Sequence, residues 1–363
     1  MIDKVAATGQ WEPMIRSLQM ARGLAALAVT LFHTSGMFAD PRFGFDRPFW
    51  AWTARGDLGV DFFFVLSGFI IMMAHHRDIG HPERLGNYAF KRFVRIYPMY
   101  WIFTLLVVLG AAAIGGVSTV PHRPADVASV TTLIRFSGFS TPVATAWTLF
   151  HEMLFYGFFA LLIFRRWMGI GALALWFGTV AVLFHYTPFG MWSFTGTLLS
   201  AHNLSFLLGI AAYFVTGRLG QMGAAAFLFA GAALIVLTFW AERSWGRGDV
   251  LQLGFSIGFA LLIASIVALE RFGRIGDSRL LAAIGDASYT LYLCHENVGA
   301  IALKIAVRIG LTRWLDHHVL YGLIVVGTVV FSLAVYRFVE APLLRWSRHW
   351  YAGRRAALRA AEV

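Results

Sequence analysis

The chain has 363 residues, of which 58% are hydrophobic and only 13% are charged, and its mean hydropathy is +0.67. A soluble domain carries about 25% charged residues, so this composition excludes an ordinary soluble protein. The net charge of +11 is also found in nucleic-acid-binding proteins, but most Lys and Arg residues here lie in short segments between apolar runs. Orienting charges occupy such segments in membrane proteins, and we therefore expect no nucleic acid among the partners.

Apolar stretches of roughly 17–25 residues recur along the whole chain, and each is long enough to cross a bilayer. Because lipid offers the backbone no water, such stretches must be helices. The sequence therefore predicts an all-α fold, a polytopic transmembrane helical bundle of about ten spans. The predicted spans are 17–38, 58–76, 98–118, 147–164, 168–185, 200–216, 222–240, 250–269, 283–303 and 319–341.

Charge predicts the orientation of these spans. The segments on the side of the membrane that holds the N-terminus contain roughly twice as many Arg and Lys residues as the segments on the opposite side. Because positive charge is enriched on the cytoplasmic side, both termini are expected in the cytoplasm. We expect one transmembrane domain over 1–345 and a short basic cytoplasmic tail over 346–363. The longest outer segment, 119–146, contains three prolines and is expected to be irregular.

Two ionisable residues lie in the first predicted span, where such groups are costly and therefore candidates for function. Arg22 and His33 are eleven residues apart, which is three helical turns plus about 20°, so they share one face and lie roughly 16 Å apart along the axis. Arg22 alone could instead extend its charge to the inner membrane surface.

Other spans place polar groups at a depth similar to that of His33. Asp61 lies in the first turns of the second span and Glu152 lies early in the fourth, at a depth similar to that of His33. The ninth span adds His295 and Glu296, somewhat beyond the midplane towards the outside. Asp61 could equally be an interfacial residue or a helix cap, and His295 a hydrogen-bonded packing residue. The sole cysteine, Cys294, lies in an apolar run and is expected to be buried.

A basic pair precedes the third span. Arg92 and Arg95 are three residues apart and share a face if this segment is helical. Two guanidinium groups on one face suit a ligand rich in phosphate. Contact with lipid headgroups is the competing interpretation.

In this order, the segments resemble the acyltransferase 3 family of membrane acyltransferases, and the resemblance covers about residues 15–345. Its first motif is an Arg and a His separated by ten residues, matched by Arg22 and His33. The other matching segments are Gly59–Phe69 with Ser67, the pair Arg92 and Arg95, Trp147-Thr148-Leu149 followed by Glu152, Ser288–His295 with Tyr289, and Glu340 with Pro342. Two departures are His151, where the family usually has an apolar residue, and Asn297, where a proline often follows the late histidine.

The resemblance implies an integral-membrane O-acyltransferase of the bacterial inner membrane. It implies acyl-coenzyme A, usually acetyl, as a co-substrate rather than a permanently bound cofactor. The implied acceptor is a hydroxyl of a surface or secreted saccharide, a lipid-linked glycan or a small metabolite. The histidine of the first span is implied to be catalytic and the arginines to bind the donor. No metal-ligand spacing is present, and a homodimer is compatible with the sequence without being required by it.

Acyl transfer needs a base, and His33 is the predicted general base because an imidazole accepts and returns protons near neutral pH. Glu152 is the first choice for the carboxylate that orients His33, and Asp61 is the second. Arg92 and Arg95 are predicted to bind the donor phosphates, with Arg22 guiding the pantetheine arm.

Further site candidates are Ser67, Trp147, Tyr289 and His295. We expect direct transfer rather than an acyl-enzyme formed at Ser67, Cys294 or His33. Two other function classes stay open at this point, a transporter or flippase and a non-catalytic partner of a polysaccharide assembly.

Overall fold

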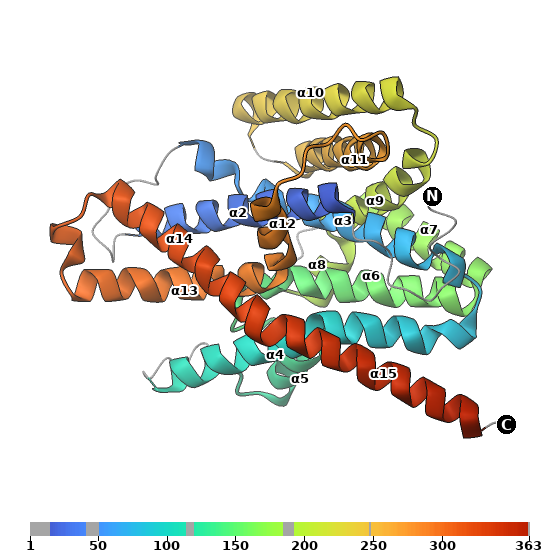
Figure 1. Ribbon diagram of the computed structural model, residues 1–363, viewed down its shortest axis with the longest axis horizontal. Helices are drawn as coiled ribbons and strands as arrows, with labels where there is room; N and C mark the ends of the chain where they lie inside the picture. The colour runs from blue at the N-terminus through green and yellow to red at the C-terminus, as the bar shows by residue number, and fades with distance from the viewer. Residues whose placement is uncertain (1–14, 41–50, 114–119, 184–191, 247, 362–363) are drawn as a thin grey trace.

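The structure is a computed structural model that describes residues 15–40, 51–113, 120–183, 192–246 and 248–361. The described residues form helices joined by short turns, and they include no strand (Figure 1). The helices are α2 Arg16–Phe38, α3 Leu58–His75, α4 Leu85–Ala113, α5 Pro124–Thr132, α6 Trp147–Phe164, α7 Arg166–Leu183, α8 Phe194–Leu199, α9 His202–Thr216, α10 Gln221–Trp245, α11 Asp249–Arg271, α12 Arg279–Asp286, α13 Ser288–Arg308, α14 His317–Val335 and α15 Ala341–Ala361. The predicted all-α fold is confirmed.

Eight helical runs within the described residues are long and apolar enough to cross a membrane. They correspond to the predicted spans on α3, α4, α6, α7, α9, α10, α11 and α14. The other two predicted spans, α2 and α13, have 23 and 21 residues, which is long enough to cross a hydrocarbon layer of about 30 Å. They are the two helices that carry Arg22, His33 and His295. The predicted span ends at 118 and 185 lie outside the described residues.

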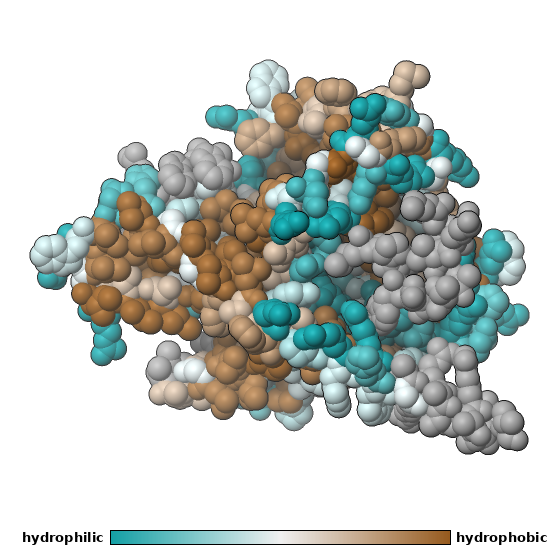
Figure 2. Space-filling view, in the orientation of Figure 1, coloured by the Kyte–Doolittle hydropathy of each residue, from teal (hydrophilic) through white to brown (hydrophobic). Residues whose placement is uncertain are grey.

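Apolar side chains cover much of the molecular surface over α13 and α14 (Figure 2). The exposed large residues of these two helices are Ile301, Ile305, Val307, Val319, Leu323, Val326, Val330 and Phe331. A surface patch of this kind would be unfavourable in water and is expected where a protein faces lipid. The chain is therefore a multi-pass membrane protein.

The structure corrects two predictions about the segments next to Pro98 and after α4. The third span was expected to begin at Pro98, but α4 begins at Leu85 and continues through that proline. Arg92 and Arg95 therefore lie on a helix, as their shared face requires. The segment 119–146 was expected to be irregular, but it contains α5, which packs beside the middle of α4 (Figure 1).

The last turn of α5 packs against α4 through polar side chains. The donors and acceptors pair as Tyr97 Oη to Thr132 O at 2.6 Å, Tyr100 Oη to Val130 O at 2.8 Å, and Trp101 Nε1 to Thr131 O at 3.0 Å. The final carbonyl groups of a helix have no partner within the helix, and away from water they need partners from elsewhere. The side chains of α4 supply these partners and fix the position of α5.

Close helix crossings position the site. A Cβ atom at Gly68 of α3 would lie 2.1 Å from the carbonyl oxygen of Phe206, and one at Gly209 of α9 would lie 1.9 Å from that of Val65. Only glycine permits this approach, as is common between membrane helices. The crossing holds α3 against α9 beside Ser67.

Candidate active site

A cavity of about 170 Å³ lies between α2, α3, α4, α6 and α13. Six of the ten predicted site residues line this cavity: Arg22, Ser67, Arg92, Arg95, Glu152 and Tyr289. They come from five helices that are far apart in the sequence. The tertiary fold therefore brings the predicted donor-binding residues together around one space, which we call the arginine cavity.

Neutral partners hold Arg22 in the arginine cavity. Its Nη1 atom donates to Gln19 Oε1 at 3.0 Å and its Nη2 atom donates to Ser288 Oγ at 2.9 Å. Gln19 in turn donates to Asp286 Oδ1 at 2.5 Å. Among the described residues, no carboxylate pairs directly with this guanidinium group, which lines the cavity instead of only extending to the end of its helix.

Arg95 is neutralised within the protein. Its Nη1 atom donates to Glu340 Oε1 at 2.8 Å, and its guanidinium group lies over the Tyr289 ring at 5.2 Å. Glu340 is buried and also accepts from Thr290 Oγ1 at 2.6 Å. Glu340 ends the π-helical turn between α14 and α15, and such turns often mark functional positions.

Arg92 has no such carboxylate. Its Nη2 atom is 3.4 Å from His75 Nε2, its guanidinium group lies 5.7 Å from the centre of the Tyr156 ring, and its Nε atom is buried without a hydrogen-bond partner. Arg92 makes no ion pair within the described part of the chain. Of the predicted arginine pair, Arg92 is therefore the one with its charge available for a ligand phosphate.

Glu152 also belongs to the arginine cavity. One of its oxygens, Oε1, accepts from Ser67 Oγ at 3.0 Å and from the hydroxyl of Tyr156. The expected contact between Glu152 and His33 is not found. Because Glu152 faces the cavity, the carboxylate that orients His33 must come from another helix.

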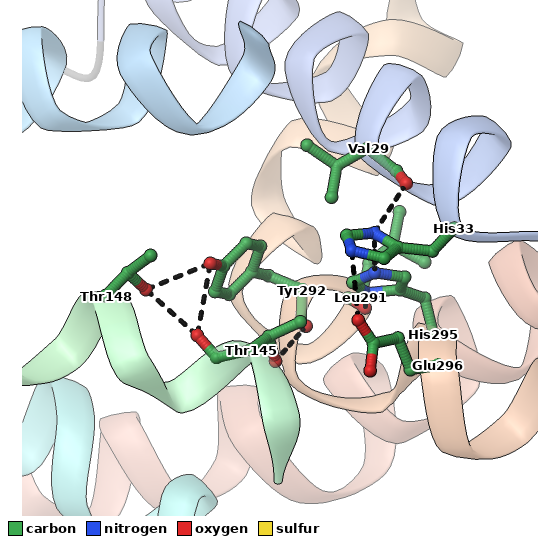
Figure 3. A network of polar contacts seen from close by, with 8 residues as sticks. All are labelled: Val29, His33, Thr145, Thr148, Leu291, Tyr292, His295 and Glu296. Atoms are coloured by element: carbon green, nitrogen blue, oxygen red, sulfur yellow. Dashed lines mark hydrogen bonds and ion pairs between the residues drawn. The ribbon is translucent and has the colours of Figure 1, made fainter. Parts of the chain in front are cut away.

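His33 lies in a second polar group, formed with α13 (Figure 3). Its Nε2 atom is 3.0 Å from Glu296 Oε1, and its Nδ1 atom is 3.0 Å from Val29 O and 3.0 Å from His295 Nε2. The Nδ1 atom of His295 lies 3.0 Å from Leu291 O. We call His33, His295 and Glu296 the histidine cluster.

The contacts of the histidine cluster are consistent with one placement of its protons. Each Nδ1 atom faces a backbone carbonyl, which only accepts, so each Nδ1 carries a hydrogen. The one hydrogen on His33 Nδ1 is then shared between two acceptors, Val29 O and His295 Nε2. The remaining contact joins His33 Nε2 and the Glu296 carboxylate. Without a proton on either atom, both would be acceptors and could not form a hydrogen bond with each other. One proton between His33 Nε2 and Glu296 Oε1 would complete the hydrogen bonds of the cluster.

The same three groups could also hold a metal ion. Their ligand atoms all lie within 4.8 Å of one another, and two imidazoles with one carboxylate form a ligand set that zinc uses. Hydrogen bonds among the three side chains already account for the observed arrangement.

Tyr292 lines the arginine cavity, and its ring lies between Thr148 and the histidine cluster (Figure 3). Its ring lines the cavity on one side, and on the other its centroid lies 6.0 Å from that of His295. Its hydroxyl is 2.9 Å from Thr148 Oγ1 and donates to Thr145 O at 3.2 Å. In this structure, hydrogen bonds hold the tyrosine between the two groups.

Asp61 and Trp147 belong to a third polar group, at the contact of α3, α6, α9 and α11. Asp61 Oδ1 accepts from Gln252 Nε2 at 3.1 Å and lies 3.3 Å from His202 Nδ1. The Trp147 ring lies 5.2 Å from the His202 ring. His151, noted above as a departure from the family, is buried, and its ring centroid lies 6.0 Å from that of His202.

The expected meeting of His33, Asp61 and Glu152 is therefore not found, since each belongs to a different polar group. Glu296 was recognised as a polar residue of the ninth span but not predicted as a site residue, and it is the carboxylate that contacts His33. It follows His295 directly, and its polarity within an apolar span was the only signal. Cys294 is fully buried, as expected, so it is unsuited to carrying an acyl group.

Comparison with known proteins shows the family of this chain. The family model described as an acyltransferase domain matches residues 15–337. The chain belongs to this acyltransferase family. It is 30% identical over 308 residues to the exopolysaccharide production protein ExoZ of Rhizobium meliloti (strain 1021), covering 81% of this chain and 91% of that protein.

More distant relatives are larger proteins. A Staphylococcus aureus (strain COL) protein that is provisionally named an O-acetyltransferase is 25% identical over 375 residues, and the match covers 90% of this chain but 57% of that protein. A protein of strain MSSA476 with the same provisional name is also 25% identical, over 368 residues. No solved structure matches the chain. Family membership identifies the protein as an acyltransferase.

Proposed function

We propose that the protein is an O-acyltransferase that moves an acyl group, acetyl in the simplest case, from acyl-coenzyme A to a hydroxyl of a surface or secreted saccharide or glycolipid. The observation that carries this proposal is the adjacency of two different polar groups. A cavity lined by arginines lies on one side of Tyr292, and a histidine–carboxylate pair that can take up a proton lies on the other. The name of the exopolysaccharide relative supports a saccharide acceptor.

The donor would bind in the arginine cavity. Arg92, which has no carboxylate partner among the described residues, would pair with a donor phosphate, and Arg22 would contact the pantetheine arm through a guanidinium group held by Gln19 and Ser288. Arg95 would act differently from its neighbour, because Glu340 already neutralises it. Its function would be to position the Tyr289 side chain, which lines the arginine cavity.

The histidine cluster would supply the base. In the form without the shared proton, the lone pair of His33 Nε2 and the Glu296 carboxylate face each other, which favours taking a proton from an acceptor hydroxyl. The side chains of His33 and Glu296 are 27% and 24% exposed, so an acceptor can approach them. Glu296 would stabilise the imidazolium that forms, and His295 would hold the ring through Nδ1.

The transfer step needs only the thioester donor, the acceptor hydroxyl and His33. As the proton moves to His33 Nε2, the acceptor oxygen bonds to the thioester carbonyl carbon and the carbonyl oxygen becomes negative. The tetrahedral intermediate collapses, the carbon–sulfur bond breaks, and the coenzyme A thiolate takes the proton from His33. We propose direct transfer, with Tyr292 moving aside so that the thioester reaches His33.

The location of the protein is part of the same proposal. We place it in the bacterial inner membrane with both termini in the cytoplasm, so that the donor enters from the cytoplasm and the acceptor from outside. The whole of residues 1–345 would form one catalytic domain, and the end of α15 would be a basic cytoplasmic tail.

The test uses the purified full chain in lipid nanodiscs with acetyl-coenzyme A, with and without an extract of the surface glycans of the source cell. We expect thiol release that requires the extract and is lost in His33→Ala, together with acetylated glycan detected by mass spectrometry. Donor-only incubation with labelled acetyl-coenzyme A should leave no label on the denatured protein. Donor binding without thiol release on any acyl donor would instead favour a transporter.

A further inference from the structure

A second and larger cavity lies between α4, α6 and α8, beside the segment that follows α5. Its volume is about 590 Å³, and its lining is mostly apolar, including Phe150, Met153 and Leu154. Pockets that hold small molecules occupy about 300–1,000 Å³. The lining residues Ile134 and Leu161 are 46% and 37% exposed, so the cavity opens on an apolar part of the surface. We call it the apolar cavity.

One buried cation lines this apolar space. Arg135 is 6% exposed, and its Nη1 atom donates to Phe139 O at 3.1 Å. Its guanidinium carbon lies 3.7 Å from the centre of the Phe150 ring and 4.9 Å from that of Trp192. Its Nε atom is buried and has no hydrogen-bond partner among the residues that the structure describes. Burial lowers the pKa of Arg135 to about 10, so the group stays positively charged at neutral pH.

No carboxylate in the described part of the chain forms an ion pair with Arg135. A buried charge without a partner is costly, because desolvation is not offset by an opposite charge. The two aromatic rings offset part of this cost but leave the Nε donor unused. The arrangement therefore fits an anionic group that enters from outside the protein.

The proposed donor site does not account for this arginine. The two cavities share a wall at Arg92 and Tyr156, but Arg135 lines only the apolar one. Along α6, Phe150 beside Arg135 and Tyr156 beside Arg92 are six residues apart, or about 9 Å. The anion at Arg135 would thus be a second ligand.

We propose that the apolar cavity binds one anionic lipid of the surrounding bilayer, with a hydrocarbon chain in the cavity and the headgroup phosphate at Arg135. The exposed apolar rim gives a lipid chain lateral access, and α4 and α6 are both long and apolar enough to cross the membrane. A phosphate group accepts several hydrogen bonds from a guanidinium group. This inference does not depend on the proposed acyl transfer.

The experiment measures which lipid stays bound. The full chain is reconstituted with equal amounts of phosphatidylglycerol and phosphatidylcholine of matched chain length, released into detergent, and examined by native mass spectrometry. We expect one phosphatidylglycerol per chain, preferred over phosphatidylcholine by about tenfold, the factor that one charge-assisted interaction provides. Arg135→Gln should remove this preference.

A second variant separates loss of the site from loss of folding. A Cβ atom at Gly157, which lines the apolar cavity, meets nothing within 4 Å, so Gly157→Leu should fill the space without a backbone clash and displace the lipid. Gly178→Leu on α7, whose Cβ position is equally open, and Arg308→Gln at the end of α13 are the matched controls and should retain it.

Two results would overturn the inference. The first is equal retention of the two lipids by the unaltered protein, or retention of neither. The second is phosphatidylglycerol retention that Arg135→Gln and Gly157→Leu reduce no more than their controls do. Loss of phosphatidylglycerol retention in Arg135→Gln and Gly157→Leu, but not in their controls, would support the proposed lipid site.

Discussion

Replacing Glu296 by glutamine tests the role of the histidine cluster most directly. Gln is nearly isosteric with Glu, so a hydrogen bond to His33 Nε2 can persist across the 3.0 Å contact, but the negative charge is lost. The imidazolium formed when His33 accepts a proton then loses its charged partner. Ground-state binding of the donor, on the other side of Tyr292, should change little.

The size of the effect follows from the contact. A hydrogen bond to a charged group contributes about 1.5–3 kcal/mol, and a neutral one about 1 kcal/mol. Both side chains are about a quarter exposed, and solvent screens part of the difference. A loss of about 1–2 kcal/mol in the transition state corresponds to a decrease in kcat of about 5- to 30-fold.

The assay is the initial rate of thiol release in nanodiscs at varied acetyl-coenzyme A, which separates kcat from the KM for the donor. Asp61→Asn is the matched control, since it also removes a buried carboxylate beside a histidine, His202, and we expect its kcat to stay near that of the unaltered protein. A full kcat in Glu296→Gln, together with a large loss in Glu152→Gln or Asp61→Asn, would refute the assignment of Glu296.

Two neighbouring arginines should differ when each is replaced by glutamine. Arg92→Gln should raise the KM for acetyl-coenzyme A about tenfold, because one charge-assisted contact is lost, with little change in thermal stability. Arg95→Gln should instead lower the unfolding midpoint in detergent, because Glu340, which is 1% exposed, stays buried without its partner. The expected loss of stability is about 3–5 kcal/mol. Equal midpoints in the two variants would contradict this expectation. Gly209→Ala should destabilise the protein by about 1–3 kcal/mol or more, because its Cβ would lie 1.9 Å from a main-chain oxygen of α3, whereas Gly178→Ala meets nothing within 4 Å and should leave the midpoint unchanged.

The sequence by itself determined the class of the protein and much of the composition of its site. Apolar runs long enough to cross a bilayer must be helical, so the all-α membrane fold followed from length and hydropathy alone. Helical spacing placed Arg22 and His33 on one face of α2 and Arg92 and Arg95 on one face of α4. Local periodicity is sufficient for these statements, because it fixes which residues share a face of the same helix.

Only the tertiary structure decided which helix each face meets. The carboxylate beside His33 is Glu296 of α13 instead of Glu152 of α6, and Glu340 neutralises Arg95 across 245 residues of sequence. Helical periodicity carries no information about the rotation of one span against another. That rotation depends on contacts such as the glycine crossing of α3 with α9 and the capping of α5 by α4. The sequence therefore predicted most of the residues that line the candidate site, while the pairing of their charges required the packed helices.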